Sequence, residues 1–203
     1  MTATDIHIKN IIGESLTKAT SYQEYRNLVQ NLVAEGKSTG ELQTDALSNY
    51  SMLNDKRMKR LDKTTKLTEQ AIEDITSYNG DVTWLVLTES WCGDAAQTMP
   101  VINKVAELND NITLKVVLRD ENEALMNEFL TNGGKSIPKL IAIDNTSGNV
   151  IGDWGPRPSK ATQLVNDYKA EHGKLTPEFK QDLQVWYNKD KGQNTVADLL
   201  KLV

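Results

Sequence analysis

The sequence contains a single cysteine, Cys92, and only two histidines, His7 and His172. One cysteine cannot form an intrachain disulfide, and so few Cys and His residues exclude a zinc site of the usual kind. We expect no metal and no other cofactor, and we place His7 in a flexible terminus and His172 at a helix end. Any thiol chemistry must therefore use one sulfur, with its partner supplied by another molecule.

Long apolar runs are also absent. The runs at 84–87 and 140–143 are far shorter than the about 20 residues that a membrane-spanning helix needs. No basic and apolar leader opens the chain, so we expect a soluble, cytoplasmic protein with no membrane partner. The 28 acidic residues outnumber the 23 basic ones, and the net charge of −5 argues against nucleic acid as a partner.

Three stretches with different patterns follow one another along the chain. We predict a helical N-terminal extension at 1–80, an α/β domain at 81–173 and a helical C-terminal extension at 174–203. Apolar residues recur at steps of three and four in the first stretch, which predicts a helical hairpin or small bundle. The pair Thr176-Pro177 is typical of a helix start and opens the third stretch.

The middle stretch predicts the element order β-α-β-α-β-β-α. Apolar runs and alternating patterns place strands at 82–88, 112–118, 140–143 and 149–154. Helical patterns separate the first three strands, and a last one covers 161–168. Strands separated by helices should be parallel, and the last two should form an antiparallel hairpin. We therefore predict a mixed sheet flanked by helices.

Cys92 occupies a specific position, directly after the first strand and on the first turn of the next helix. Backbone amides there lack partners within the helix and, together with the helix dipole, favour a thiolate. Cysteines at such positions commonly have a depressed pKa and raised reactivity. The alternative is a small buried apolar residue, as free cysteines often are. Position alone does not decide between the two.

Further residues strengthen the first interpretation. Trp91-Cys92-Gly93 forms a tight entrance to the helix, and Pro100 lies within that helix. Ser136-Ile137-Pro138 directly precedes the third strand. In these motifs and in its element order, the stretch 82–173 resembles the thioredoxin superfamily. The resemblance implies a thioredoxin-like fold with a cis peptide bond at Ile137-Pro138, beside the cysteine.

The chain departs from the thioredoxin pattern at the second cysteine, which Ala95 replaces. The buried acid that thioredoxins carry in the preceding strand corresponds here to Val86. The two losses are consistent, because without a resolving cysteine that acid has no proton to remove. The motif at 91–97, W-C-G-D-A-A-Q, therefore resembles a single-cysteine branch. Its one attack would give a mixed disulfide or a sulfenic acid that an external thiol must resolve.

Charged residues around the motif each allow a structural and a functional role. Asp94 suits the first turn of a helix but disfavours a thiolate two residues away. Arg119 either faces the site or pairs with a neighbouring acid. Arg157, in the loop 154–158, is a candidate for binding an anionic group such as a carboxylate. Gly155 in the same loop either forms a wall of a substrate groove or belongs to a rigid connection.

The densest positive cluster lies at 56–66, in the helical extension. Charge runs on helices are usually solvated faces, although this one also suits docking of an acidic partner. The extension itself could cover the sheet, narrow access to Cys92 or mediate a homodimer. The helical pattern does not choose among these.

Two functions from different classes follow. In the first, the chain is a monothiol redox protein whose nucleophile Cys92 attacks a protein or low-molecular-weight disulfide. In the second, it is a redox-inactive module that binds a peptide in a groove among Trp91, Pro138 and Gly155. The sequence does not say whether Cys92 turns over. The substrate-binding candidates all lie near the cysteine in the predicted fold: Trp91, Gly93, Asp94, Ile137, Pro138, Gly155 and Arg157.

Overall fold

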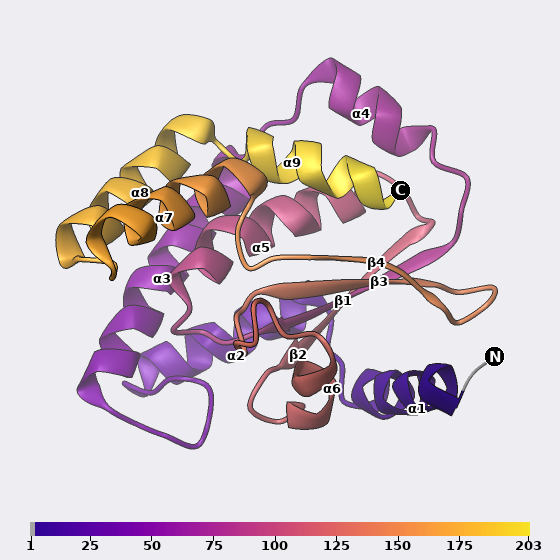
Figure 1. Cartoon of the computed structure of the whole chain (residues 1–203), viewed down its shortest axis with the longest axis horizontal. Coiled ribbons are helices and arrows are strands. Elements are labelled where there is room, and N and C mark those ends of the chain that lie inside the picture. Colours follow the sequence, from indigo (N-terminus) through magenta and orange to yellow (C-terminus); the bar gives the residue numbers. More distant parts are fainter. Residues whose placement is uncertain (1–2) are drawn as a thin grey trace.

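The computed structural model describes residues 3–203 as a four-stranded sheet with helices on both faces (Figure 1). The strands follow the order β2-β1-β3-β4 across the sheet. Their bounds are Val82–Thr88 for β1, Ile112–Leu118 for β2, Lys139–Asp144 for β3 and Val150–Trp154 for β4. All seven residues of β1 are buried, as an apolar strand covered on both faces requires.

The direction of β3 differs from the prediction. β2 runs parallel to β1, whereas β3 is antiparallel to β1 and β4 is antiparallel to β3. The expectation that all helix-separated strands are parallel is therefore wrong. The helix between β2 and β3, α6 (Glu123–Glu128), has six residues. This short helix does not run the length of the sheet, so it does not form the long crossover that joins parallel strands. β3 therefore starts at the edge where β2 ends, and it runs the other way.

Two pairs of helices cover the two faces of the sheet. α5 (Gly93–Ala106) and α9 (Gln193–Leu199) pack on one face, and α1 (Ala3–Thr17) and α6 lie on the other (Figure 1). A short 3-10 turn, Leu200–Leu202, follows α9 and contacts β4. Among residues 3–203, no helix combines the length and the apolar composition that spanning a bilayer requires.

The N-terminal extension is helical from the first described residues. Its other helices are α2 (Tyr22–Ala34), α3 (Asp45–Thr64) and α4 (Glu69–Thr76), and α3 packs along α5. Ser21, Thr44 and Thr68 cap these helices by accepting hydrogen bonds from first-turn amides. The expectation of a flexible terminus around His7 is wrong, because α1 buries Ile12 in the main core.

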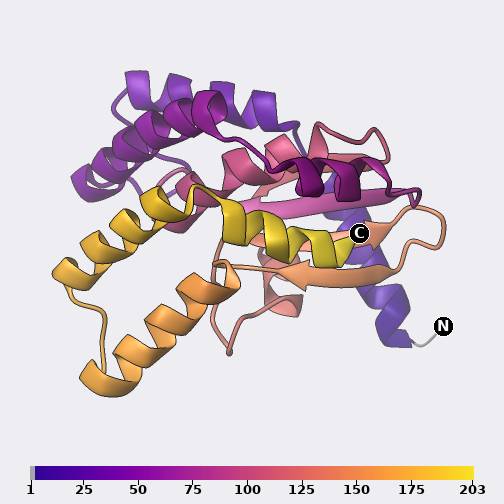
Figure 2. The ribbon, with the colours of Figure 1, turned by 90° about the horizontal axis from the view of Figure 1, so that it is seen from above.

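The two helices after β4 form a hairpin that stands apart from the sheet. α7 (Ser159–His172) and α8 (Pro177–Asp190) lie next to each other at one end of the molecule (Figures 1 and 2). They bury a small core of their own, made by Ala161, Val165, Leu183 and Tyr187. The helix predicted over 161–168 is present as part of α7. It stands apart from the sheet, and α9 is the helix that packs beside α5. The boundary predicted at residue 173 thus falls between two helices that pack on each other.

The first prediction concerns Gly155, whose φ is +122° and where a Cβ would lie 2.1 Å from the Pro138 carbonyl oxygen. Because steric collision adds to backbone strain, we predict that Gly155→Ala lowers the free energy of unfolding by about 3 kcal/mol or more. Gly133→Ala is the control, with φ +76° and no neighbouring atom within 4 Å. It should cost about 1–2 kcal/mol from strain alone. Equal costs in urea unfolding would contradict this account.

Candidate functional site

Cys92 lies at the turn from β1 into α5 and is the N-cap residue of that helix. Its Sγ accepts a hydrogen bond from the Ala95 amide at 3.5 Å. The thiol in turn donates to the Ile137 carbonyl oxygen at 3.2 Å. The peptide bond between Ile137 and Pro138 is cis. The fold thus brings together two segments, the cysteine turn and the proline turn, that lie 45 residues apart.

The thiol is buried and protonated, which differs from the prediction. Only 9% of Cys92 is exposed. Burial raises the pKa of the Cys92 thiol to about 12, and the carboxylate of Asp94 adds to the rise. The amides of Ala95 and Asp94 oppose this, as expected for a helix N-terminus, but they are outweighed. The expectation of a depressed pKa is therefore wrong, because desolvation exceeds the effect of the helix amides.

Asp94 forms the centre of a buried polar network. Its carboxylate makes an ion pair with Arg157 at 2.7 Å and accepts a hydrogen bond from the Tyr187 hydroxyl at 3.0 Å. Burial raises the pKa of Asp94, and its two partners offset only part of this rise. The anion that Arg157 binds in this form is thus a side chain of the same protein. The network ties the loop after β4 and helix α8 to the first turn of α5.

Gly155 is in close contact with another segment of the same chain, the turn that contains Pro138. Since a Cβ at this position would lie 2.1 Å from the Pro138 carbonyl oxygen, the two backbones are in direct contact. The glycine therefore serves the packing of β4 and its loop against the start of β3. A peptide groove among Trp91, Pro138 and Gly155 stays a prediction.

Trp91 is half-buried and carries an arginine over its ring. The Arg119 guanidinium lies 4.8 Å from the ring centroid, within the range of a cation–π contact. Arg119 also forms an ion pair with Asp120 at 2.7 Å, so it pairs with a neighbouring acid, as one of its two predicted roles requires. Behind this pair lies Glu89, fully buried, whose Oε1 accepts the Asp120 amide at 3.0 Å. Burial raises the pKa of Glu89, and its Oε2 has no hydrogen-bond partner in the described chain.

Helix α8 makes polar contacts with the site that no local sequence pattern indicated. Besides the Tyr187 bond, Gln97 donates to the side-chain oxygen of Gln184 at 2.9 Å. One turn further on, Asn188 accepts a hydrogen bond from Arg60 of α3 at 2.7 Å. The partners of each bond are more than 80 residues apart, so local patterns cannot reveal them. The C-terminal extension is thus part of the site.

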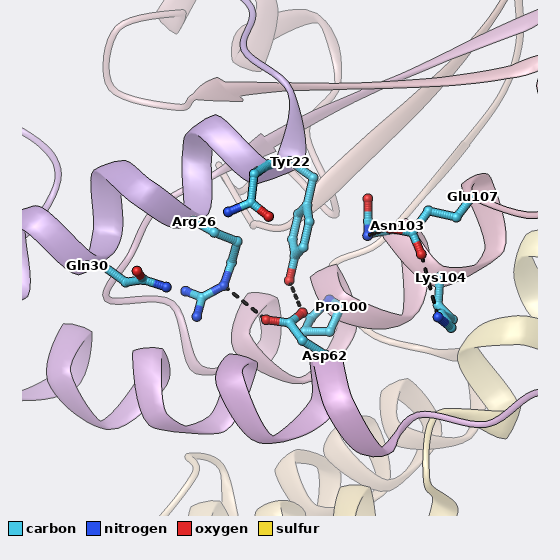
Figure 3. A pocket seen from close by; sticks show the side chains of 9 residues that line it. Tyr22, Arg26, Gln30, Asp62, Pro100, Asn103, Lys104 and Glu107 are labelled. Atoms are coloured by element: carbon cyan, nitrogen blue, oxygen red, sulfur yellow. Dashed lines mark hydrogen bonds and ion pairs between the residues drawn. The ribbon is translucent and has the colours of Figure 1, made fainter.

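A polar pocket of about 270 Å³ lies among α2, α3 and α5, away from the cysteine turn. Figure 3 shows the side chains that line it. Arg26, only 2% exposed, pairs there with Asp55 at 2.9 Å and with Asp62 at 3.2 Å. Tyr22 donates to Asp62 at 2.6 Å. These charges satisfy one another and join α2 to α3. Within residues 3–203, no group of three Cys, His, Asp or Glu side chains could hold a metal ion.

The fold and the site together define an α/β protein with a lone cysteine at a strand-to-helix turn, facing a cis-proline turn. Residues 40–169 match the family described as Thioredoxin. Because this match spans more than half of the 203 residues, the chain belongs to the thioredoxin family. No curated protein matches the chain.

Two solved structures share the fold. One is a protein of unknown function from Pseudomonas aeruginosa, with 17% sequence identity and a TM-score of 0.58, covering 90% of this chain and 96% of its own. The other is an HIV epitope-scaffold, with 18% identity and a TM-score of 0.56, covering 90% of this chain and 97% of its own. At these identities the likeness concerns the fold alone. The predicted thioredoxin-like fold class with helical extensions is confirmed.

The second prediction concerns the charges that surround the thiol. Since Asp94 raises and Arg157 lowers the pKa of Cys92, Asp94→Asn should move the pH midpoint of alkylation down and Arg157→Met should move it up. At pH 8 the alkylation rates should change about tenfold in opposite directions. The wild-type midpoint should lie well above that of the urea-unfolded chain.

Iodoacetamide labelling followed by mass spectrometry measures these midpoints. The exposed Asp110→Asn variant serves as the control, because it removes one carboxylate far from the site and should leave the midpoint unchanged. A shift in the same direction for Asp94→Asn and Arg157→Met would contradict the electrostatic account.

Proposed function

We propose that this thioredoxin-family protein belongs to a single-cysteine branch and performs monothiol redox chemistry with Cys92 as nucleophile. Ala95 stands where a resolving cysteine would lie, so release from the mixed disulfide needs an external thiol. A lone thiol of this kind suits a reducing compartment such as the cytoplasm. Partners would be disulfides of proteins or small molecules.

The observation that carries the proposal is the pair of hydrogen bonds made by the Cys92 sulfur. The Ala95 amide donates to Sγ at 3.5 Å, and such a bond strengthens when the sulfur becomes a thiolate. The S–H points at the Ile137 carbonyl oxygen, 3.2 Å away, in the turn that contains the cis peptide bond. An inert core cysteine needs neither contact, since it behaves as a small apolar residue.

The chemistry requires the thiol to lose its proton to solvent before it reacts. The thiolate then attacks one sulfur of a disulfide, forming a bond between Cys92 and that sulfur while the other sulfur leaves as a thiolate. A second, external thiolate attacks the partner sulfur of this mixed disulfide. It forms a new disulfide and releases Cys92 as a thiolate. One disulfide and one thiol are consumed, and one of each is produced.

Reaction also requires access to the buried thiol, and we propose that the α7–α8 hairpin controls this access. The hairpin meets the rest of the chain near Cys92 through polar contacts, including those of Tyr187 with Asp94 and of Gln184 with Gln97. Water can replace such bonds at little cost, unlike the burial of a large apolar face. Displacement of α8 would hydrate the thiol and Asp94, and it would remove the main cause of the raised thiol pKa.

A second candidate function is a redox-inactive binding module. The same burial that leaves Cys92 9% exposed and raises its pKa to about 12 favours this candidate, because a neutral and covered thiol reacts slowly. The directed contacts of the Cys92 sulfur with the Ala95 amide and the Ile137 carbonyl oxygen argue against it, because a redox-inactive module does not need them.

The third prediction separates the two candidates by adduct formation. Incubation with bis(2-hydroxyethyl) disulfide at pH 8 should add one mercaptoethanol unit to the wild-type chain, observed by mass spectrometry as a single adduct. Dithiothreitol should then remove it. Cys92→Ser should gain no adduct while unfolding at the same urea concentration. A wild-type chain that stays unmodified until it is unfolded would overturn the redox proposal.

The fourth prediction concerns the cover. If the α7–α8 hairpin opens without unfolding of the sheet, amide hydrogens in α8 should exchange at least tenfold faster than those in α5 and β1. Tyr187→Phe, which removes one bond to Asp94, should speed exchange in α8 and adduct formation at Cys92 together. Tyr168→Phe, which removes a hydroxyl on α7 paired with Thr176, is the control for the hairpin itself. Coincident exchange of α8 and β1 would exclude a separate opening.

A further inference from the structure

Two of the five arginines in this chain have no carboxylate partner among the described residues. Arg26, Arg119 and Arg157 each form an ion pair with an aspartate. Arg57 instead donates to the neutral side chain of Asn54 at 2.8 Å, and Arg60 to that of Asn188 at 2.7 Å. These two cations belong to the basic cluster at 56–66, and the proposed redox chemistry does not use them.

Arg57 lies beside the cysteine turn, whereas Arg60 reaches Asn188 of α8. A Cβ built on Gly93, the residue after Cys92, would lie 4.0 Å from Arg57 Nη1 and 3.9 Å from Gln184 Nε2. Gly93 has no side chain, and two nitrogen donors from different helices lie at van der Waals distance from the position that its Cβ would take; we call this methyl-sized position the notch. The side-chain oxygen of Gln184 is already occupied by Gln97, which leaves its Nε2 directed at the notch without a described acceptor.

The guanidinium group of Arg57 is not fully solvated. The side chain is half-buried, and burial together with the neighbouring Arg60 lowers its pKa. A partly desolvated guanidinium without a counter-ion is costly to maintain, whereas an incoming carboxylate would accept its hydrogen bonds and balance its charge. The missing counter-ion is therefore best supplied by the ligand.

We propose that the notch beside Gly93 binds a carboxylate of a small disulfide or thiol. Arg57 and Gln184 hold the carboxylate first, and Arg57 alone holds it once α8 moves away and the sulfur of the ligand reaches Cys92. This inference rests on the proposed monothiol chemistry and names its substrate class. A small molecule suits the site better than an acidic polypeptide for two reasons. Helix α8 covers the notch, and the Ile137 carbonyl, with which an extended peptide would pair, already accepts the Cys92 thiol.

The experiment compares two small disulfides that differ in charge. Rates of adduct formation at Cys92 are measured at pH 8 with 3,3′-dithiodipropionate, which carries carboxylates, and with the neutral bis(2-hydroxyethyl) disulfide. Each rate is divided by the rate at which the same disulfide reacts with free mercaptoethanol, so intrinsic reactivity cancels. We expect the wild-type ratio to favour the carboxylate roughly tenfold and to fall as salt is added.

Variants then assign the preference to the notch. Arg57→Gln should reduce the ratio of the two normalised rates to near one, whatever its effect on either rate alone. Lys59→Gln removes an equal charge from an exposed position of the same helix and should leave the ratio as in the wild type. A wild-type ratio near one, or an unchanged ratio in Arg57→Gln, would overturn the inference.

The remaining outcomes have separate meanings. If neither disulfide modifies Cys92, the proposed redox chemistry fails, and the carboxylate proposal fails with it. If the neutral disulfide reacts but the carboxylate brings no advantage, only the inference about Arg57 fails. A disulfide-linked peptide rich in glutamate forms the last arm. If it reacts faster than dithiodipropionate after normalisation, the ligand is an acidic polypeptide and the small-molecule assignment is wrong.

Discussion

The buried carboxylate of Asp94 holds the closed form of the site together. It lies in the first turn of α5 and binds Arg157 from the loop after β4 and Tyr187 from α8. Three parts of the chain that are remote in sequence therefore meet beside Cys92. A buried carboxylate without these partners would be strongly unfavourable, so the contacts depend on one another. The charge of Asp94, held in place by these contacts, adds to the effect of burial in keeping the Cys92 thiol protonated.

Two opposing effects act on the thiol, and their balance decides its state. The amides at the start of α5 stabilise a thiolate, as they do for any cysteine at a helix N-terminus. Burial and the charge of Asp94 favour the neutral thiol, and they prevail in the closed form. The balance depends on hydration, because desolvation is the largest contribution. A change in cover rather than a change in covalent structure can therefore convert an inert thiol into a nucleophile.

Local sequence patterns were sufficient to predict the helices and strands, but not how these helices and strands pack against one another. The apolar run of β1 and the turn at Cys92 each depend on a few neighbouring residues, so both were predictable. The direction of β3 depends on how the whole connection between Leu118 and Lys139 folds, and the pKa of Cys92 depends on its burial in the folded chain. Tyr187 looked like part of an apolar helix face, and only tertiary structure shows its hydroxyl bound to Asp94. Contacts between residues that are far apart in the sequence could not be predicted from local patterns.

In the proposed redox function, burial of the thiol would also compensate for the missing second cysteine. A thioredoxin-family protein with two cysteines can expel a bound partner itself, whereas a lone Cys92 thiolate that stays exposed would remain trapped in mixed disulfides or be oxidised further. A neutral, covered thiol avoids both reactions until a partner gains access. The unpaired Arg57 at the edge of that cover offers a binding contact that precedes any reaction at sulfur. Opening α8 would cost free energy. Only a partner whose carboxylate pairs with Arg57 would regain that free energy on binding, so the opening step would select for such partners.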